Sequence, residues 1–466
     1  MTDPARMPAT ELADLIRRRQ ISPVEVVGSV LARIAALEPR LNAFTEVFAD
    51  AARDAARAAE AAVMAGGELG PLHGVPVTIK DLTAMAGVAL RAGSRTTEGQ
   101  VPAQDAPLIG RLRAAGAIIV GRTTTPEFGW KGVSESPLTG ITHNPWRHGG
   151  NAGASSAGAG AACAAGFGPL HQGGDGAGSI RMPAHFSGVF GLKPTFGRVA
   201  HAPSSNSDNV VHQGPITRTV ADAALMLRCM AGPDPRDYLS LEAPPADYPA
   251  RLGGDLAGLR IAFSPDLGHA RVDRDVAALV RDAAASLPAL GAAVEEVTPA
   301  WGPDGPALIR FFWPTQYAQH TRLLPRWRDA MDPGLVALIE ANAGRTVADY
   351  QIMRERKLAY IGAIGAFFAE WDYLVTPAVS VAAFPATRLA PEGWPEHAWD
   401  WLTWAEFSYP FNFTGNPAAS VPCGFTPAGL PVGLQIVGRR FDDAGVLRVA
   451  SVLEAARPWA QHWPSL

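Results

Sequence analysis

The stretch from Asn144 to Thr195 constrains the fold most, because it is built largely from glycine, alanine and serine. Two small-residue loops carry one serine each, Ser155 and Ser179, and they flank an alanine-rich run over 156–166 that predicts a short buried helix. Side chains this small let backbone segments approach closely, and glycine tolerates dihedral angles that point N–H groups at a ligand. The stretch therefore fits either tight helix–sheet packing or an anion pocket beside a serine nucleophile, as in acyl transfer.

Three ordered motifs in this stretch are long enough to be specific. They read GASSAGA at 153–159, GGDGAGSIR at 173–181 and GLKPT at 191–195. In order and spacing they resemble the signature of the amidase signature family of serine hydrolases. The resemblance implies an α/β fold: a single domain over 1–466, with a large mixed twisted sheet covered by helices on both faces.

The resemblance also implies a catalytic centre. Ser179 would be the nucleophile, Lys80 the base, and Ser155 the bridge that passes the proton between them, held by a cis peptide bond. Such a site cleaves the C–N bond of an amide, or an ester or a carbamate as in a urethanase, without a metal or organic cofactor. Asp175 and Arg181 are predicted to pin the loop. The implied oxyanion hole consists of the backbone N–H groups of Gly176, Ala177, Gly178 and Ser179.

Lys80 follows a predicted buried strand over 75–79, and sites in α/β proteins gather at strand ends. The residues alone favour a surface ion pair between Lys80 and Asp81. The segment GVPVTIKD at 74–81 resembles the family's catalytic-lysine segment, which reverses that preference. A lysine acts as a base where burial lowers its pKa enough to leave it neutral. The histidines lack a carboxylate pattern or a nucleophile elbow, and we expect structural roles for them, among them His73, His171 and His185.

Residues 126–132, PEFGWKG, resemble the family loop that lines the substrate pocket. Gly129 and Trp130 are therefore expected as substrate contacts, with a position in the core as the alternative for Trp130. Two departures from the family pattern affect the pocket. Gly174 replaces a threonine, and Gly150 stands where an arginine is often found.

Residues 301–407 look different, because they carry eight of the twelve tryptophans: Trp301, Trp313, Trp327, Trp371, Trp394, Trp399, Trp401 and Trp404. We expect an irregular, aromatic-rich insert that sets substrate specificity, although scattered tryptophans more often belong to a core. An apolar pocket predicts a bulky apolar or aryl substrate. Two alternatives stay open: the A subunit of a glutamine-dependent tRNA amidotransferase, with a polar pocket and a partner chain, and a non-catalytic scaffold on the same fold.

The rest of the chain predicts helices and strands without a domain break. Helices are expected across 9–65, where Ser22, Pro23 and Glu25 form a start similar to a capping box. Buried strands are expected over 117–120, 419–423 and 432–437.

Composition disfavours several classes of function. The net charge is −4 with mixed signs, so no basic surface predicts a nucleic-acid partner, and no segment fits a phosphate-binding loop. No run of about 18 apolar residues occurs, so no membrane partner is expected. Cys163, Cys229 and Cys423 are odd in number and far apart, which favours reduced thiols and a cytoplasmic location over a disulfide framework or a metal site. The expected partners are a small-molecule amide and a second copy of the chain in a homodimer.

Overall fold

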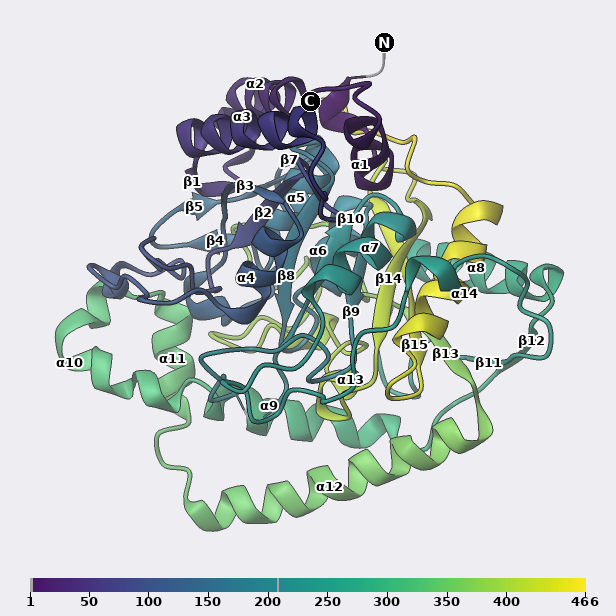
Figure 1. Cartoon of the computed structure of the whole chain (residues 1–466). Coiled ribbons are helices and arrows are strands. Elements are labelled where there is room, and N and C mark those ends of the chain that lie inside the picture. The colour runs from purple at the N-terminus through teal and green to yellow at the C-terminus, as the bar shows by residue number, and fades with distance from the viewer. Residues whose placement is uncertain (1–2, 208) are drawn as a thin grey trace.

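The computed structural model describes residues 3–207 and 209–466, and an 11-stranded sheet runs through it (Figure 1). In sheet order the strands are β1 (Phe44–Val47), β3 (Ile118–Thr123), β2 (Pro76–Lys80), β8 (Leu170–Asp175), β10 (His212–Thr217), β9 (Phe190–Lys193), β14 (Ala418–Phe425), β15 (Pro431–Gly438), β13 (Tyr373–Pro377), β11 (Arg260–Phe263) and β12 (Ala293–Glu296). β2 pairs in parallel with β3 and β8, β11 pairs in parallel with β12 and β13, and the other neighbouring pairs are antiparallel.

Helices cover both faces of this sheet. Side chains of a strand alternate between the two faces, so apolar residues of one strand reach two separate cores. Ile261 and Phe263 belong to one hydrophobic core and Ala262 to another. The core with Ile261 is closed by α1 (Ala9–Arg17), α4 (Pro107–Ala114), α7 (Val220–Met230), α8 (Arg274–Ser286) and α14 (Asp443–Ala456). The cores of the other face include α2 (Pro23–Leu41), α3 (Ala49–Ala65), α5 (Ala157–Ala165), α6 (Arg181–Ser187), α9 (Gly305–Thr315), α11 (Pro333–Ala341), α12 (Val347–Glu370) and α13 (Pro410–Phe413). The predicted fold class is confirmed.

Local sequence signals set several element boundaries as expected. Ser22 and Glu25 form the predicted capping box at the start of α2, with Pro23 in its first turn. The expected strands over 117–120, 419–423 and 432–437 correspond to β3, β14 and β15. The region 9–65 is not all helical, however. α2 ends where Asn42 adopts a left-handed conformation, and the chain then pairs Phe44 with Thr123 as the short edge strand β1.

The second glycine motif begins inside a strand, whereas the sequence predicted a loop. Gly173 and Gly174 belong to β8, which is buried along its whole length and pairs with β2 and β10. A Cβ at Gly173 would lie 2.9 Å from Ile180 and 3.1 Å from Ser156. Glycine is present there because neighbouring side chains fill the space above the strand, and the loop that carries Ser179 starts only after Asp175.

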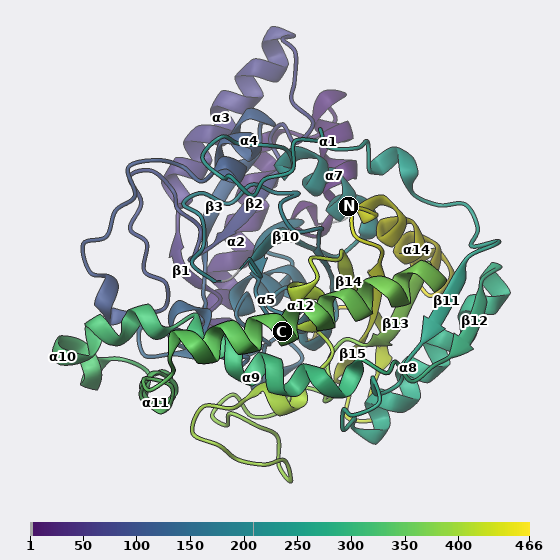
Figure 2. The same cartoon turned by 90° about the horizontal axis from the view of Figure 1, so that it is seen from below.

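The aromatic segment 301–407 is more regular than predicted. It contains α9, α10 (Leu324–Trp327), α11 and α12, and Figure 2 shows α12 as a long helix beside α9. Thr346 caps α12 in a capping box with Asp349, a local signal that is also present in the sequence. The segment also supplies β13, which lies between β15 and β11 in the large sheet.

Two small two-stranded sheets lie between β3 and Ser155 in the chain. β4 (Glu135–Ser136) pairs with β5 (Gly140–Ile141), and β6 (His143–Asn144) pairs with β7 (Arg147–Asn151). Across residues 3–207 and 209–466, no helix combines the length and apolar character needed to span a membrane.

Candidate active site

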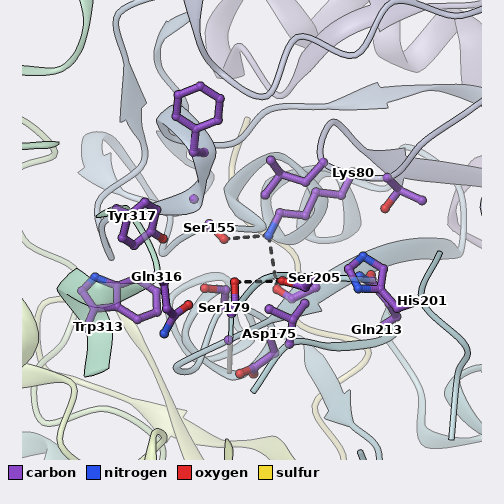
Figure 3. A pocket seen from close by; sticks show the side chains of 18 residues that line it. Lys80, Ser155, Asp175, Ser179, His201, Ser205, Gln213, Trp313, Gln316 and Tyr317 are labelled. Atoms are coloured by element: carbon purple, nitrogen blue, oxygen red, sulfur yellow. Dashed lines mark hydrogen bonds between the residues drawn. The ribbon is translucent and has the colours of Figure 1, made fainter. Parts of the chain in front are cut away.

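A cavity of about 190 Å³ opens at the carboxyl ends of β2 and β8. Lys80, Ser155 and Ser179 all line it, and they come from three neighbouring elements (Figure 3). Lys80 ends β2, Ser155 precedes α5, and Ser179 lies between β8 and α6. The fold therefore brings together the three residues that the sequence motifs singled out.

The Lys80 ammonium group is held by three oxygen atoms in the protein interior. Its Nζ donates to Ser155 Oγ at 2.7 Å, to Ser156 Oγ at 3.0 Å and to the Gly174 carbonyl at 3.2 Å. Its backbone N–H donates to Gln172 Oε1 at 3.0 Å, which ties β2 to β8 at this point. Lys80 is only 2 % exposed, so its Nζ is fixed in position and removed from water.

Burial has the electrostatic effect that a general base requires. Desolvation lowers the pKa of Lys80 to about 7, against a smaller opposing effect from the Asp175 carboxylate. The surface ion pair of Lys80 with Asp81 is not formed. Asp81 is fully buried and pairs with Arg122 at 3.1 Å, on the other side of the strand end. Close to neutral pH, a substantial fraction of the Lys80 side chain is thus the free amine.

Ser155 is positioned by its neighbours in the chain and in space. The peptide bond between Ala154 and Ser155 is cis, as the resemblance implies. Gly129 packs directly on Ser155, since a Cβ at Gly129 would lie 3.0 Å from Ser155 Oγ. Gly129 lines the cavity at the expected place, and its φ of +73° suits glycine.

Ser156 is a site residue that the sequence analysis assigned only to the start of a helix. Its hydroxyl accepts from Lys80 Nζ, donates to the Gly174 carbonyl at 3.1 Å and accepts from the Gly174 N–H at 3.2 Å. Ser156 therefore connects the Lys80 side chain to β8. The adjacent serines of the GASSAGA motif were the available signal.

The loop that carries Ser179 folds around the Asp175 carboxylate. Asp175 Oδ1 accepts from the Gly178 N–H at 2.7 Å, and Oδ2 accepts from the Ile180 N–H at 3.1 Å. A donor already bonded to a carboxylate is not available to an oxyanion. The Gly178 N–H is therefore not among the available donors, although it was predicted to belong to the oxyanion hole. The N–H groups of Gly176, Ala177 and Ser179 have no partner among the described residues. The Ser179 hydroxyl is likewise free of hydrogen bonds to the described residues.

Arg181 pins this loop, as predicted. Its guanidinium binds both Asp175 oxygens, at 3.0 and 2.9 Å, and is fully buried. Arg181 also donates to Asn412 Oδ1, Gln435 Oε1 and the Ser408 carbonyl. Burial alone raises the pKa of Asp175, but the charge and hydrogen bonds of Arg181, the charge of Lys193 and the hydrogen bond from Asn412 together outweigh it and hold that pKa well below its ordinary value. Asp175 therefore stays ionised and keeps the loop closed around it.

Trp130, expected as a substrate contact, lies in the core. It is 1 % exposed and belongs to the large aromatic cluster, and the described cavity lining does not include it. The indole N–H groups of Trp313 and Trp401 donate to its carbonyl oxygen at 2.8 and 2.9 Å. The core alternative is correct, because the turn at Gly129 directs the next residue away from the cavity.

Other cavity residues carry no motif and were missed from the sequence. Two aromatic residues of the segment 301–407 reach the cavity, Trp313 and Tyr317, and the remaining described tryptophans of that segment do not. The polar lining residues without a sequence signal are Thr83, His201, Ser205, Ser207, Gln213 and Gln316.

The histidines that were expected to be structural have partners in the protein interior. His171 and His185 are fully buried and contact the backbone carbonyls of Gly168 and Val381, each at 3.0 Å. The described residues contain no group of three or more His, Cys, Asp or Glu side chains arranged to hold a metal ion.

The sequence profile of the Amidase family matches residues 25–447. The chain belongs to the amidase signature family. Among its relatives is an acylamidase from Rhodococcus erythropolis, 42% identical over 472 residues that cover 98% of this chain and 97% of the relative. The A subunit of the glutamyl-tRNA(Gln) amidotransferase from Roseiflexus sp. (strain RS-1) is 34% identical over 488 residues, covering 98% of both chains.

Solved structures of amidase signature enzymes share the whole fold. A bacterial aryl acylamidase of this family superposes with a TM-score of 0.90 at 28% identity, covering 98% of this chain and 97% of that one. The 6-aminohexanoate cyclic dimer hydrolase also gives 0.90, at 30% identity and 99% coverage of both chains. The protein is a hydrolase of carbon–nitrogen bonds in amides, as the sequence predicted, and not a non-catalytic scaffold.

Proposed function

We propose that this protein is a serine amidohydrolase that cleaves amides with a bulky apolar or aryl group, through an acyl-enzyme on Ser179. One observation carries the proposal. The Lys80 amine, with a pKa lowered to about 7, donates to Ser155 Oγ at 2.7 Å in a cavity that Ser179 also lines. A neutral amine, a bridging hydroxyl and a free hydroxyl are the parts that an activated serine nucleophile needs.

In the proposed reaction, Lys80 takes a proton from Ser155 while Ser155 takes one from Ser179. Ser179 Oγ forms a bond to the carbonyl carbon of the substrate, and the carbonyl oxygen becomes an oxyanion. Donors for that oxyanion are the unpartnered N–H groups of Gly176, Ala177 and Ser179. As the C–N bond breaks, the proton returns from Lys80 through Ser155 to the leaving nitrogen. Water then attacks the ester on Ser179, using the same proton relay, and releases the acid.

The aromatic lining supports an apolar or aryl substituent on the substrate. Phe128, Trp313 and Tyr317 line the cavity together with Leu82. The names of two relatives, an acylamidase and an aryl acylamidase, are in line with this substrate class. We extend the proposal to esters and to carbamates, a urethanase activity, because the same acyl-enzyme forms from them.

A second candidate function is the A subunit of a glutamine-dependent tRNA amidotransferase. Several relatives at 34–36% identity carry that name. Aromatic rings in the cavity disfavour glutamine as the best substrate. Comparing kcat/KM for glutamine and for an anilide separates the two candidates, and a preference for glutamine would reject the apolar substrate class.

The acyl-enzyme itself is tested with a fluorophosphonate probe and mass spectrometry. We expect a covalent adduct on Ser179 in the wild-type protein and none on that peptide in Ser179→Ala. Ser155→Ala should retain the Ser179 site but label slowly, because the proton relay is cut. An adduct found on Ser155 instead would overturn the assignment of the nucleophile.

Three further expectations accompany this function. We propose that residues 301–407 set specificity within a single domain, a role that Trp313 and Tyr317 support by lining the cavity.

We propose a cytoplasmic location, which the free thiols of Cys163 and Cys423 support. We also propose a homodimer without a nucleic-acid or membrane partner, and light scattering on the purified protein tests its assembly.

A further inference from the structure

The cavity presents different chemistry on its two sides. In Figure 3, Trp313 and Tyr317 lie on one side of the Lys80–Ser155 pair, and His201 and Gln213 lie on the other. Since the scissile bond must reach the serines between these sides, the two substituents of the amide meet different walls. One wall is aromatic, and the other carries polar side chains that the catalytic mechanism does not use.

Hydrogen bonding fixes the orientation of Gln172, the neighbour of Gln213. The backbone N–H of Lys80 is only a donor, so the atom it reaches at 3.0 Å is the Gln172 amide oxygen. The carbonyl of Gly173 is only an acceptor, so the atom of Gln172 at 2.9 Å from it is the amide nitrogen. Both ends of this side chain are therefore assigned by partners whose roles are unambiguous.

The orientation of Gln213 follows from that of Gln172. The Gln172 nitrogen lies 2.5 Å from Gln213, which must offer its oxygen, Oε1, to accept this bond. The Nε2 amide group of Gln213 is left over, and no acceptor for it exists among the described residues. Gln213 lines the cavity and is only 5 % exposed. Gln213 Nε2 is not one of the completely buried side-chain atoms that lack a partner, so this donor is open to the cavity. An acceptor atom on a bound substrate would satisfy it when substrate displaces water from the cavity.

Gly174 makes room for this side chain. Gln213 and Gly174 are direct partners in the pairing of β10 with β8. A Cβ at Gly174 would lie 3.3 Å from Gln213 Oε1 and 3.6 Å from Nε2. The side chain that is absent at position 174 thus leaves the space at the strand end in which the Gln213 amide lies.

We propose that Gln213 is a specificity-determining residue that donates a hydrogen bond from Nε2 to an oxygen acceptor of the substrate. This inference rests on the proposed function and sharpens it. The substrate is an amide with an apolar or aryl group on one side of the scissile bond and a carbonyl or ether oxygen on the other.

The test uses matched amides that differ in one group. In a series of anilides, one methylene of the acyl chain is replaced by a carbonyl at successive positions, and benzamides with the carbonyl in the amine chain cover the reverse orientation. We expect the best carbonyl compound to exceed its methylene analogue by about five- to tenfold in kcat/KM, as for one neutral hydrogen bond. In Gln213→Met, which keeps the length but cannot donate, this ratio should fall to about one.

Gln213→Glu gives a stricter test, because it still accepts from Gln172 but turns an acceptor toward the cavity. We expect it to lose the preference for the carbonyl chain and to prefer a chain that ends in an ammonium group over its methyl analogue. Gln316→Met is the matched control. Gln316 lies beside Trp313 on the aromatic side, so its loss should leave the carbonyl ratio as in the wild type.

The outcomes separate this inference from the proposed function. Circular dichroism confirms folding of each variant. Hydrolysis of both members of each pair at equal rates, or a carbonyl preference that survives in Gln213→Met, would contradict the role of Gln213 alone. Failure of the wild-type enzyme to hydrolyse any member of either series would contradict the proposed function and this inference with it.

Discussion

The catalytic stretch and the aromatic segment 301–407 are packed in opposite ways. In α5 every residue is alanine, glycine or cysteine and every residue is buried, and a Cβ at Gly158 would lie 2.2 Å from the Ala43 carbonyl oxygen. In the aromatic segment the interior is filled by large rings such as Trp401 and Trp404. Backbone contact fixes atoms tightly, whereas rings fill volume around them. The first region therefore positions Ser155 and Ser179, the proposed catalytic serines, and the second contributes Trp313 and Tyr317 to the cavity wall.

Substitutions at Lys80 test whether the tightly packed region holds the catalytic groups, and they should have the largest effect on kcat/KM. We expect Lys80→Ala to lower kcat/KM by about 10²–10⁴-fold, the range for loss of a general base. Lys80→Arg should lose most of the same activity, because a guanidinium does not deprotonate. Lys131→Arg is the control: Lys131 is also buried, but it pairs with Glu135 and Asp332 and needs only its charge. A folded Lys80→Arg enzyme with near-normal activity would exclude the proposed base.

A substitution at Gly129 tests how closely the neighbouring backbone fixes the position of the Ser155 side chain. We expect Gly129→Ala to lower kcat by about 10²-fold, because the new methyl group would press on Ser155 Oγ and displace the proton relay. Gly140→Ala is a matched control, since Gly140 has the same φ of +73° but no atom within 4 Å of its added Cβ. If both variants lose activity equally, backbone strain is responsible and the contact with Ser155 is not.

The pH profile tests the burial of Lys80. The reaction needs the neutral amine, and burial lowers its pKa to about 7, so kcat/KM should be constant above this pH and fall about tenfold per unit well below it. Asp175 does not titrate there, because its pKa lies far lower. His201, which also lines the cavity, has a pKa lowered by burial. His201→Gln should therefore keep the midpoint of the profile, and a shifted midpoint would assign the titration to the histidine.

Substitutions at two tryptophans distinguish a role in core packing from a role in the cavity wall. They should have the smallest effects on activity. Trp313 and Trp401 both donate to the Trp130 carbonyl, but Trp313 lines the cavity and Trp401 does not. Replacing either by phenylalanine should lower the free energy of unfolding by about 1–2 kcal/mol. Trp313→Phe should also raise KM for anilides a few-fold, whereas Trp401→Phe should not. Equal effects on KM would remove the distinction between wall and core.

The sequence predicted which residues meet at the cavity, because the signals are local. Ser155, Ser179 and Lys80 lie in contiguous motifs, and the capping box at Ser22 depends on residues three positions apart. Gly178 shows the limit of such signals. Its N–H was expected in the oxyanion hole, but which way a glycine N–H points depends on the fold of the loop around Asp175.

Apart from Gly129, the residues of the cavity wall around the serines and Lys80 were not predicted, for a related reason. Gln213 has no motif, and it reaches the cavity because the register of β10 sets it beside Gly174. Trp130 was expected in the pocket loop and Trp313 in the aromatic segment, yet Trp130 packs in the core and Trp313 lines the cavity. Such differences arise from the pairing of distant segments, which composition and periodicity do not report.

The packing of α5 also has a consequence for the way this enzyme can change by mutation. At Gly158 and Gly160 the space for a side chain is already taken, by Thr124 and the Ala43 carbonyl at one and by Pro183 and Ser187 at the other. A library of random substitutions should therefore return almost no active variants in this helix. Adaptation to a new amide is directed instead to positions whose side chains end in the cavity, so that selection alters what the enzyme accepts long before it alters how the bond is cut.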